Sequence, residues 1–281
     1  MQTERKKVTD KEYRDALLGI LERIHRVCEE QGVRYMAMGG TLLGAVRHQG
    51  FIPWDDDIDI MMPREDYPKF AKAFASEDGR FYTLDPNNSE YYYNNFARAC
   101  DGKMILKLHG VCDIEHLGVF VDVFFLDRWP QEEAEVAQYR KDLLTAYKNV
   151  QYALPAKIMN TLDKKRRIKR KLQVPRIVLN RYLIGLKKRK QQKENLLTKY
   201  KDTNTGVRAT VPDKLRNKRW YIAEDALDDR LLMPFEHLQI YVPASYDYIL
   251  TFLFKDYMQL PPEDQRKSHH HFVAYWNEVR S

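Results

Sequence analysis

A run of four aspartates within five positions constrains this chain more than any other feature of its sequence. The acids are Asp55, Asp56, Asp57 and Asp59, and the apolar run Ile60-Met61-Met62 follows them directly. Crowded carboxylates repel one another, and burying them without partners costs more still. A hard divalent cation would relieve that repulsion, and oxygen-only ligands suit Mg²⁺ or Mn²⁺ rather than Zn²⁺. On a strand over 57–62, Asp57 and Asp59 would share one face with Cα atoms ~6–7 Å apart, so both could reach one cation.

A further carboxylate, Asp122, interrupts the apolar run 119–125. An acid within so apolar a strand needs a partner. One interpretation pairs Asp122 with an arginine or a backbone donor. The other, which we favour, places it on a strand beside Asp57 and Asp59, where it completes the metal site. Asp127 has the opposite parity from Asp122, so we expect it on the other face of that strand.

Two glycines and a threonine, Gly39-Gly40-Thr41, stand between an expected strand over 33–38 and an expected helical turn over 41–48. Backbone N–H groups at such a place can bind phosphate oxygens. A Gly-Gly pair usually marks a turn and nothing more, but here an Asp-x-Asp strand follows it. The combination is similar to the nucleotidyltransferase fold typified by DNA polymerase beta. In that fold glycines hold the phosphates, two strand carboxylates bind metal, and a third carboxylate lies on a nearby strand.

Three blocks of the sequence resemble the LicD family of phosphorylcholine transferases, which are distantly related to fukutin-related protein. Residues 40–60 closely resemble the signature of that family, residues 120–127 look like its second block, and residues 243–262 look like its C-terminal block. The last block departs from the family at Phe254-Lys255, where Tyr-Gly is common. The resemblance covers most of the chain but leaves out roughly residues 150–205.

The resemblance implies transfer of phosphocholine from CDP-choline to a hydroxyl of a cell-surface glycan precursor, of the teichoic acid or lipopolysaccharide type. It implies Mg²⁺ or Mn²⁺ bound by Asp57 and Asp59, where the metal would neutralise charge on the pyrophosphate and the CMP leaving group. Asp122 would be the third ligand or the base for the acceptor hydroxyl. These three acids are the expected catalytic residues, and a lipid-linked glycan is the expected acceptor.

Six motif residues are expected at the substrate: Gly39, Gly40, Thr41, Arg47, His48 and Trp54. The glycines and Thr41 would hold phosphate, and a phosphate contact also fits Arg47. For His48 a structural hydrogen bond is at least as good an interpretation. Trp54 could form part of an aromatic wall against the quaternary ammonium of choline, or it could support the aspartate loop.

The charge of the chain is unevenly distributed. Its 47 Lys and Arg stand against 40 Asp and Glu, a net charge of +7. Residues 157–193 hold 15 of those basic residues and one acid, Asp163, so this stretch carries +14 and the rest of the chain −7. A helix with an apolar face among Lys and Arg suits an anionic membrane. A helical hairpin packed on the core is an equally good interpretation. RNA binding ranks third, because no aromatic and basic recognition motif accompanies the charge, and we expect no nucleic acid partner.

Strands and helices interleave without βαβ regularity, which favours an α+β fold with a mixed sheet flanked by helices. We expect a nucleotidyltransferase-type catalytic core over 1–150, a basic helical insert over 151–206, and a C-terminal part over 207–281 that completes the catalytic domain. No apolar run approaches the ~18–20 residues of a membrane span, and the N-terminus lacks the apolar stretch of a secretory signal. The expected location is cytoplasmic, with peripheral contact on the inner face of the cell membrane.

The expected secondary structure begins with a helix that the capping box Thr9-Asp10-Lys11-Glu12 opens and Gly32 ends. Pro63 is expected to open a helix that ends at Phe74, and Pro243 to open another. Further strands are expected over 81–84, 92–99, 118–126 and 238–242, and a helix over 132–149.

Two other functions fit the same residues. A metal triad does not distinguish attack at one phosphorus from attack at its neighbour, so the transferred group could be the phosphate of another CDP-alcohol or a nucleoside monophosphate. The chain could also be a non-catalytic protein that binds an anionic membrane and is built on an inactive transferase. The intact set of Asp57, Asp59 and Asp122 argues against this last function.

Overall fold

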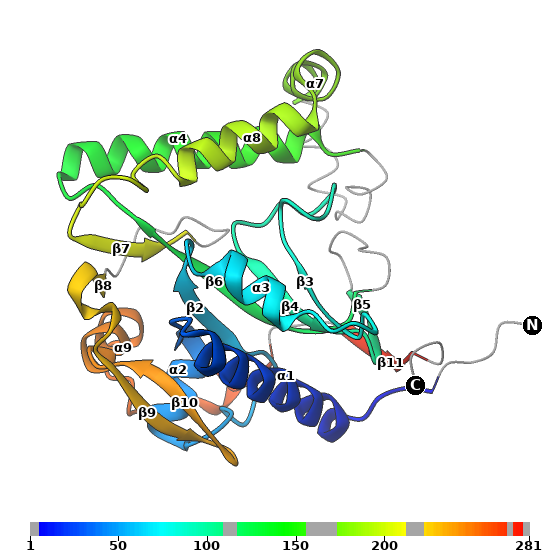
Figure 1. The fold of residues 1–281 in the computed structure, drawn as a ribbon, viewed down its shortest axis with the longest axis vertical. Coiled ribbons are helices and arrows are strands. Elements are labelled where there is room, and N and C mark those ends of the chain that lie inside the picture. Colours follow the sequence, from blue (N-terminus) through cyan, green and yellow to red (C-terminus); the bar gives the residue numbers. More distant parts are fainter. Residues whose placement is uncertain (1–5, 109–116, 156–172, 212–221, 269–271, 278–281) are drawn as a thin grey trace, which may run out of the picture.

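A mixed sheet lies at the centre of the protein, with helices packed around it (Figure 1). The computed structural model describes residues 6–108, 117–155, 173–211, 222–268 and 272–277. The strands follow the order β1 (Met36–Ala37), β2 (Asp59–Pro63), β6 (Val119–Arg128), β4 (Ala97–Asp101) and β3 (Phe81–Leu84). β2 and β6 are parallel, and the other neighbours in this order are antiparallel. This mixed sheet with its helices confirms the α+β prediction.

The ten-residue strand β6 joins the two halves of the sheet. Its first half pairs with β4, and its far end pairs with β7 (Val207–Thr210), to which β8 (Ile222–Ala223) adds. Val119, Val121 and Val123 are fully buried. Because successive side chains of a strand point to opposite faces, Asp122 lies on the face opposite these valines.

Helix α1 (Asp10–Gln31) packs against β6, β4 and α3 (Tyr67–Phe74). Its capping box is formed as expected: the Glu12 N–H donates to Thr9 Oγ1 at 3.3 Å, and the Thr9 N–H donates to Glu12 Oε2 at 2.9 Å. Gly32 ends the helix in the left-handed region, with φ 59°. Both ends of this helix were therefore predictable from local sequence.

The C-terminal elements surround α2 (Gly39–His48). β9 (Arg230–Phe235) and β10 (Leu238–Pro243) form an antiparallel hairpin, in which β9 packs on α2 and β10 packs on β1. α9 (Tyr246–Phe254) also packs on α2. β11 (Phe272–Trp276) pairs with β5 (Met104–Leu108), and two short 3-10 helices, η2 (Glu224–Leu227) and η3 (Glu263–Gln265), complete this part.

Helices α4 (Glu133–Ala153) and α8 (Leu186–Leu197) pack against each other beyond one end of the sheet, at the top of Figure 1. The short helix α7 (Val174–Val178) and the π-helix η1 (Leu179–Ile184) also contact α4. A second small core joins α4 and α8 to β7: Trp129, Tyr139, Leu143, Leu197, Tyr200, Ala209 and Val211. None of the helices in the described ranges is long and apolar enough to cross a membrane. α4 crosses residue 150, and the division of the chain at 150 and 206 stays a prediction.

Two lysines of α8 hold a loop of the central domain. Lys193 is buried, and its Nζ donates to the carbonyl oxygens of Tyr93 at 2.6 Å and Asn94 at 3.1 Å. Lys190 donates to the carbonyl oxygen of Ser89 at 2.7 Å. α8 is therefore fixed to the segment that leads into β4, even though its sequence is strongly basic.

Prolines account for two differences from the expected elements. Pro63 and Pro243 end strands β2 and β10, and the helices expected to start at them begin later, as α3 and α9. A proline is tolerated at a strand end where no neighbour needs its N–H. β1 pairs with Ile60 and Met61 and does not reach Pro63. No residue of β1 therefore needs an N–H from Pro63, and a proline is tolerated at this end of β2.

Two boundaries near the aspartates also differ from the prediction. α2 begins at Gly39 rather than at Thr41, and β2 begins at Asp59 rather than at Asp57. Asp57 lies in the loop before β2, so the argument that it shares one strand face with Asp59 is wrong. β4 likewise begins at Ala97, later than expected.

Candidate active site

The N-terminus of α2 lies directly against two of the aspartates. Gly39 has φ 56°, in the left-handed region that favours glycine, and a Cβ atom there would lie 3.4 Å from Asp59 Oδ2. A Cβ atom on Gly40 would lie 2.4 Å from Asp55 Oδ2, closer than real Cβ contacts. The two glycines thus let the carboxylates approach the start of a helix, where unpaired N–H groups and the helix dipole favour negative charge.

Thr41 connects this helix to strand β2. Its side chain is buried, and its Oγ1 accepts a hydrogen bond from the Asp59 N–H at 2.8 Å. The hydroxyl therefore fixes the position at which β2 begins relative to α2. A phosphate contact by Thr41 stays a prediction.

Asp59 and Asp122 are neighbours in the sheet, as the sequence predicted. They stand opposite each other in the parallel register of β2 and β6, and Arg98 stands opposite Asp122 on β4. Arg98 is buried, and its Nε donates to Asp122 Oδ1 at 2.9 Å. The Arg98 guanidinium also lies 3.8 Å from the centre of the Phe120 ring. Asp122 therefore pairs with an arginine and also lies beside Asp59, and its part in a metal site stays a prediction.

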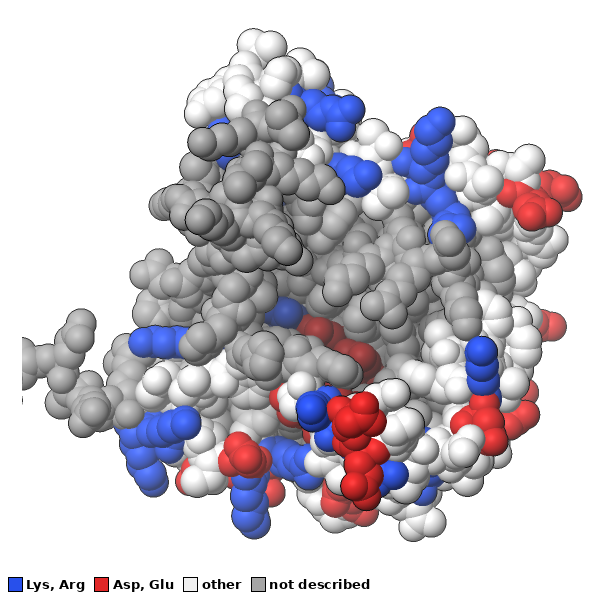
Figure 2. All heavy atoms as spheres, turned by 180° about the vertical axis from the view of Figure 1, so that it is seen from behind, with Lys and Arg blue, Asp and Glu red and all other residues white. Residues whose placement is uncertain are grey.

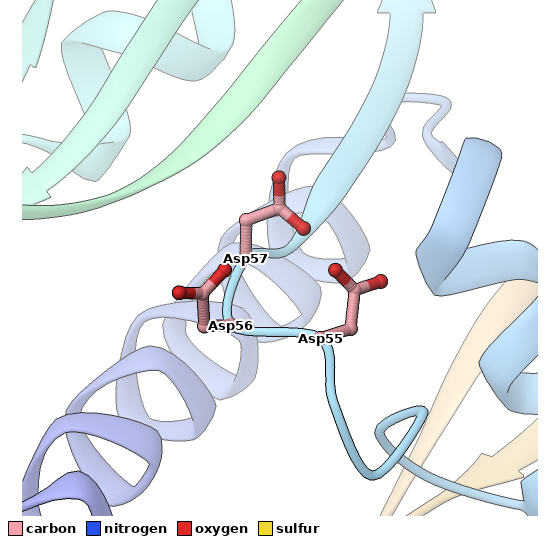
Figure 3. A group of neighbouring side chains, drawn as sticks. All are labelled: Asp55, Asp56 and Asp57. Carbon is pink, nitrogen blue, oxygen red and sulfur yellow. The ribbon is translucent and has the colours of Figure 1, made fainter. Parts of the chain in front are cut away.

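The loop before β2 brings three consecutive acids together. Asp55, Asp56 and Asp57 each offer one carboxylate oxygen, and these oxygens all lie within 4.8 Å of one another. Figure 3 shows the three side chains on the same side of the loop, with Asp57 next to the start of β2. Ser268 Oγ donates to Asp56 Oδ2 at 2.6 Å, and the Arg14 guanidinium donates to the Asp55 carbonyl at 3.1 Å. Asp57 was expected at the site, whereas the convergence of Asp55 and Asp56 with it was not.

Negative charge accumulates around Asp59. Desolvation, followed by the charges of Asp57, Asp122 and Asp55, raises the pKa of Asp59 well above its ordinary value, while Arg98 opposes the shift. The side chains of these four aspartates offer only carboxylate oxygens as metal ligands, and hard divalent cations prefer such ligands. Two positive charges placed here would remove the repulsion, so the residues present fit an Mg²⁺ or Mn²⁺ ion.

A cleft of about 800 Å³ is lined by Asp55 and Asp56, the first two acids of the loop. It lies between the first turns of α1, the loop that carries Trp54, Asp55 and Asp56, and strand β11. Figure 2 shows a hollow in the face opposite to that of Figure 1, with acidic side chains inside it. The cleft is large enough for a drug-sized ligand, and it has both polar and aromatic walls.

Arg47 and His48 connect α2 to the C-terminal part of the chain. Arg47 Nη1 donates to the Tyr257 carbonyl at 2.6 Å, and Arg47 Nε donates to His48 Nε2 at 3.0 Å. Desolvation and the charge of Arg47 lower the pKa of His48, which favours the neutral ring that accepts this bond. Both residues have structural partners, and a phosphate contact by Arg47 stays a prediction.

Trp54 borders the cleft next to the acids. The Arg266 guanidinium lies 5.6 Å from the centre of its ring, and the His48 ring centre lies 6.4 Å away with the two rings nearly perpendicular. The indole thus supports the aspartate loop and is also part of the cleft wall. These positions fit both of the roles expected for Trp54.

Residues 32–177, slightly more than half of the chain, match the family described as LicD/FKTN/FKRP, nucleotidyltransferase domain. This chain belongs to that family. Its predicted resemblance to LicD proteins is confirmed.

Three curated relatives show how far the similarity extends. "Lipopolysaccharide cholinephosphotransferase LicD" of Haemophilus influenzae is 29% identical over 276 residues, which span 96% of this chain and 99% of the relative. "Ribitol 5-phosphate transferase FKRP" of Homo sapiens is 45% identical over 53 residues, 19% of this chain and 11% of the human protein. An uncharacterised protein of Rickettsia prowazekii is 28% identical over 116 residues, 41% of each chain.

The LicD-family segment contains the acids, but residues outside it contact the site. Ser268 binds Asp56, and Arg266 lies against Trp54. Neither contact has a local signal in the sequence, because both residues follow the Pro261-Pro262 break and belong to no regular motif. The similarity to the Haemophilus influenzae relative spans 96% of this chain, so it extends well beyond the family segment.

Proposed function

We propose that this protein transfers phosphocholine from CDP-choline to a hydroxyl of a cell-surface glycan precursor, in a reaction that depends on Mg²⁺ or Mn²⁺. The observation that carries the proposal is the gathering of Asp55, Asp57, Asp59 and Asp122 against the glycine-rich start of α2. The similarity to a cholinephosphotransferase over nearly the full length supports the choice of phosphocholine. A lipopolysaccharide or teichoic acid precursor carried on a lipid is the proposed acceptor, and the reaction would take place in the cytoplasm.

The residues divide the work between binding and proton transfer. The first N–H groups of α2, which begins at Gly39, would bind donor phosphate oxygens. Asp57 and Asp59 would hold the cation, which supplies charge neutralisation at the pyrophosphate when bound. Asp122 would be either the third ligand or the base for the acceptor hydroxyl. The acceptor oxygen forms a bond to the phosphorus that bears choline, the bond from that phosphorus to CMP breaks, and CMP leaves.

A carboxylate of the site would take the proton of the acceptor hydroxyl. Asp122 is suited to this, because its bond to Arg98 holds the side chain in one orientation as an ionised acceptor. General-base assistance of this kind contributes ~10²–10⁴-fold. The cleft beside Trp54 would receive the rest of the substrates, with the indole available to the quaternary ammonium of choline.

The test is CMP release from CDP-choline by the purified protein with a glycan acceptor and Mg²⁺. Asp57→Asn and Asp59→Asn should abolish release while the protein stays folded. Asp202→Asn, a change of the same kind at an exposed position, should leave release intact. Failure of the unmodified protein to transfer choline phosphate to any acceptor tested would refute the substrate assignment.

A second donor class is favoured by one finding, the 45% identity over 53 residues to a relative named as a ribitol 5-phosphate transferase. The donor could therefore be another CDP-alcohol. A panel of CDP-alcohols and labelled nucleoside triphosphates would identify the donor by showing which phosphorus atom is bound to the acceptor. Preference for CDP-ribitol over CDP-choline would favour this second class.

A further inference from the structure

One end of the molecule presents apolar side chains to solvent. Five large residues of α7 and η1 are exposed: Val174 by 51%, Val178 by 43%, Leu179 by 44%, Tyr182 by 72% and Leu183 by 74%. Val174, Val178 and Tyr182 follow one another at i, i+4 spacing, as do Leu179 and Leu183, so they form one continuous face. We call these five residues the apolar tip. α7 lies at the extremity of the molecule in Figure 1.

The opposite side of the same segment is held by the protein. Asn180 is buried, and its Nδ2 donates to the Arg176 carbonyl at 2.6 Å. The Arg181 guanidinium donates to the Leu154 carbonyl at the end of α4, and η1 contacts both α4 and α8. The other side of this helical segment already contacts the protein, so the apolar tip is its outward, solvent-facing side.

The surroundings of the apolar tip are strongly basic. Residues 174–193 contain seven Lys and Arg and no acid, and of these Lys190 and Lys193 bind the loop before β4. Arg176, Lys187 and Lys188 are exposed beside the tip. Figure 2 shows an uncharged surface at the same end of the molecule, with Lys and Arg side chains next to it. An exposed apolar face within a field of positive charge is complementary to a surface that is apolar inside and negatively charged outside.

We propose that the apolar tip docks on an anionic lipid bilayer. Tyr182 and Leu183 would enter the region between headgroups and acyl chains, while Arg176, Lys187 and Lys188 would lie at the lipid phosphates. A second copy of the chain is a poorer occupant, because its own positive charge would oppose this one. A nucleic acid would use the charge but leave the exposed aliphatic side chains without a role.

Docking would also orient the active site. α8 follows the tip directly, and its Lys193 holds Tyr93 and Asn94, in the segment that leads to Arg98. A bilayer bound at the tip would therefore be fixed in position relative to Asp122. The delivery of a lipid-linked acceptor to Asp122 rests on the proposed function. The docking of the apolar tip on a bilayer does not.

The experiment is co-sedimentation of the full-length protein with vesicles. Binding is expected to mixed phosphatidylglycerol and phosphatidylcholine vesicles, to weaken as salt is raised, and to be much weaker on pure phosphatidylcholine. Tyr182→Ser with Leu183→Ser should weaken binding at least about tenfold, because two buried apolar side chains are lost. Lys187→Gln with Lys188→Gln should weaken it about 25-fold, since each basic side chain near an anionic surface contributes roughly fivefold.

Matched controls distinguish binding through the apolar tip from nonspecific hydrophobic or electrostatic binding to vesicles. Leu231→Ser with Leu232→Ser changes two exposed leucines on β9, and Lys69→Gln with Lys72→Gln removes two exposed charges on α3. Both controls should bind vesicles within about twofold of the unmodified protein.

Three results would overturn the proposal. The first is vesicle binding that neither pair of tip substitutions weakens. The second is vesicle binding that both control pairs weaken as much as the tip pairs do. The third is a concentration-dependent dimer, seen by analytical ultracentrifugation, that the Tyr182 and Leu183 changes abolish. CMP release on a detergent-solubilised acceptor is measured in parallel. The tip variants should keep that activity, so loss of docking and failure of the transferase assignment give different results.

Discussion

The two ends of strand β6 use carboxylates in opposite ways. At one end Asp127 receives two hydrogen bonds from Arg64, at 2.5 and 2.8 Å, and nearby Arg208 pairs with Glu65 at 2.5 Å and Glu224 at 2.7 Å. At the other end the carboxylates gather on one another. Asp59 stands beside Asp122 in the register, and desolvation, together with the charges of Asp57, Asp122 and Asp55, raises its pKa.

The difference distinguishes an acid that stabilises the fold from an acid that serves a site. A buried carboxylate matched by a bidentate arginine is compensated within the protein, and removing either partner leaves an uncompensated charge. Carboxylates that crowd together destabilise the fold and persist where the repulsion has a use, such as holding a cation. Substitutions at the two ends of β6 should therefore have opposite effects on stability.

The largest expected effect is on catalysis at the crowded end. Asp59→Asn should lower kcat/KM for CMP release by about 10³-fold or more, since it would remove one of the proposed ligands of the cation at the pyrophosphate. Without divalent metal the same variant should melt about 2 °C or more above the unmodified protein, because a like charge has been removed. Calorimetry and a CMP assay measure the two outcomes, and a lower melting temperature would contradict the crowding argument.

Stability should change in the other direction at the paired end. Asp127→Asn should lower the free energy of unfolding by about 3–5 kcal/mol, because Arg64 loses its bidentate partner in a buried place. Urea denaturation measures this change. Asp228→Asn, at an exposed aspartate, should stay within about 0.5 kcal/mol of the unmodified protein. Equal losses in the two variants would show that the pairing at Asp127 has no special weight.

Divalent metal should stabilise the protein through the crowded end alone. At a concentration 100 times its dissociation constant, Mg²⁺ should add about 2.7 kcal/mol, because a ligand that binds only the native state stabilises it. The rise in Tm should vanish in Asp59→Asn and persist in Asp127→Asn. A rise that survives in Asp59→Asn would place the metal elsewhere.

The smallest expected effect is a pH dependence at the paired end. Hydrogen bonds donated by Arg208 and Arg128 lower the pKa of Glu224 to about 2, from 4.5 for an unperturbed group. Desolvation acts in the opposite direction and is outweighed. A lowered native pKa means that the contribution of Glu224 to stability is complete above pH 4.5 and is lost as the pH falls toward 2. Glu224→Gln should flatten the acid limb of the stability curve, measured by denaturant midpoints. An unchanged acid limb would remove Glu224 from the explanation.

Much of the crowded end could be predicted from sequence, because its signals are local or periodic. The Gly-Gly pair, the Asp-x-Asp run and a lone acid in an apolar strand each have few physical explanations. These signals led to Asp59 beside Asp122, and the register of β2 and β6 has that arrangement. Parity along β6 also separated Asp127 from Asp122, and Asp127 does pair with a different arginine.

The rest depended on contacts that sequence does not reveal. Parity arguments assume a strand, whereas Asp55, Asp56 and Asp57 converge because they lie in a loop. Lys193 has the composition of a surface residue, yet it is buried on two carbonyl groups about 100 positions away. The pairing of Arg98 with Asp122 depends on the antiparallel register of β4 and β6, which places the two residues opposite each other.

The parallel pairing of β2 and β6 has a consequence for how the protein is made. The chain must pass from Pro63 to Val119 before the two strands can pair, and such long-range pairing is the slow kind in folding. A ribosome-bound fragment that ends before β6 would contain the entire glycine and aspartate motif and still lack a site. The acids would then be exposed to water on an unpaired segment, where they repel one another weakly. The binding of metal and nucleotide should therefore report completion of the sheet, late in the folding of each molecule.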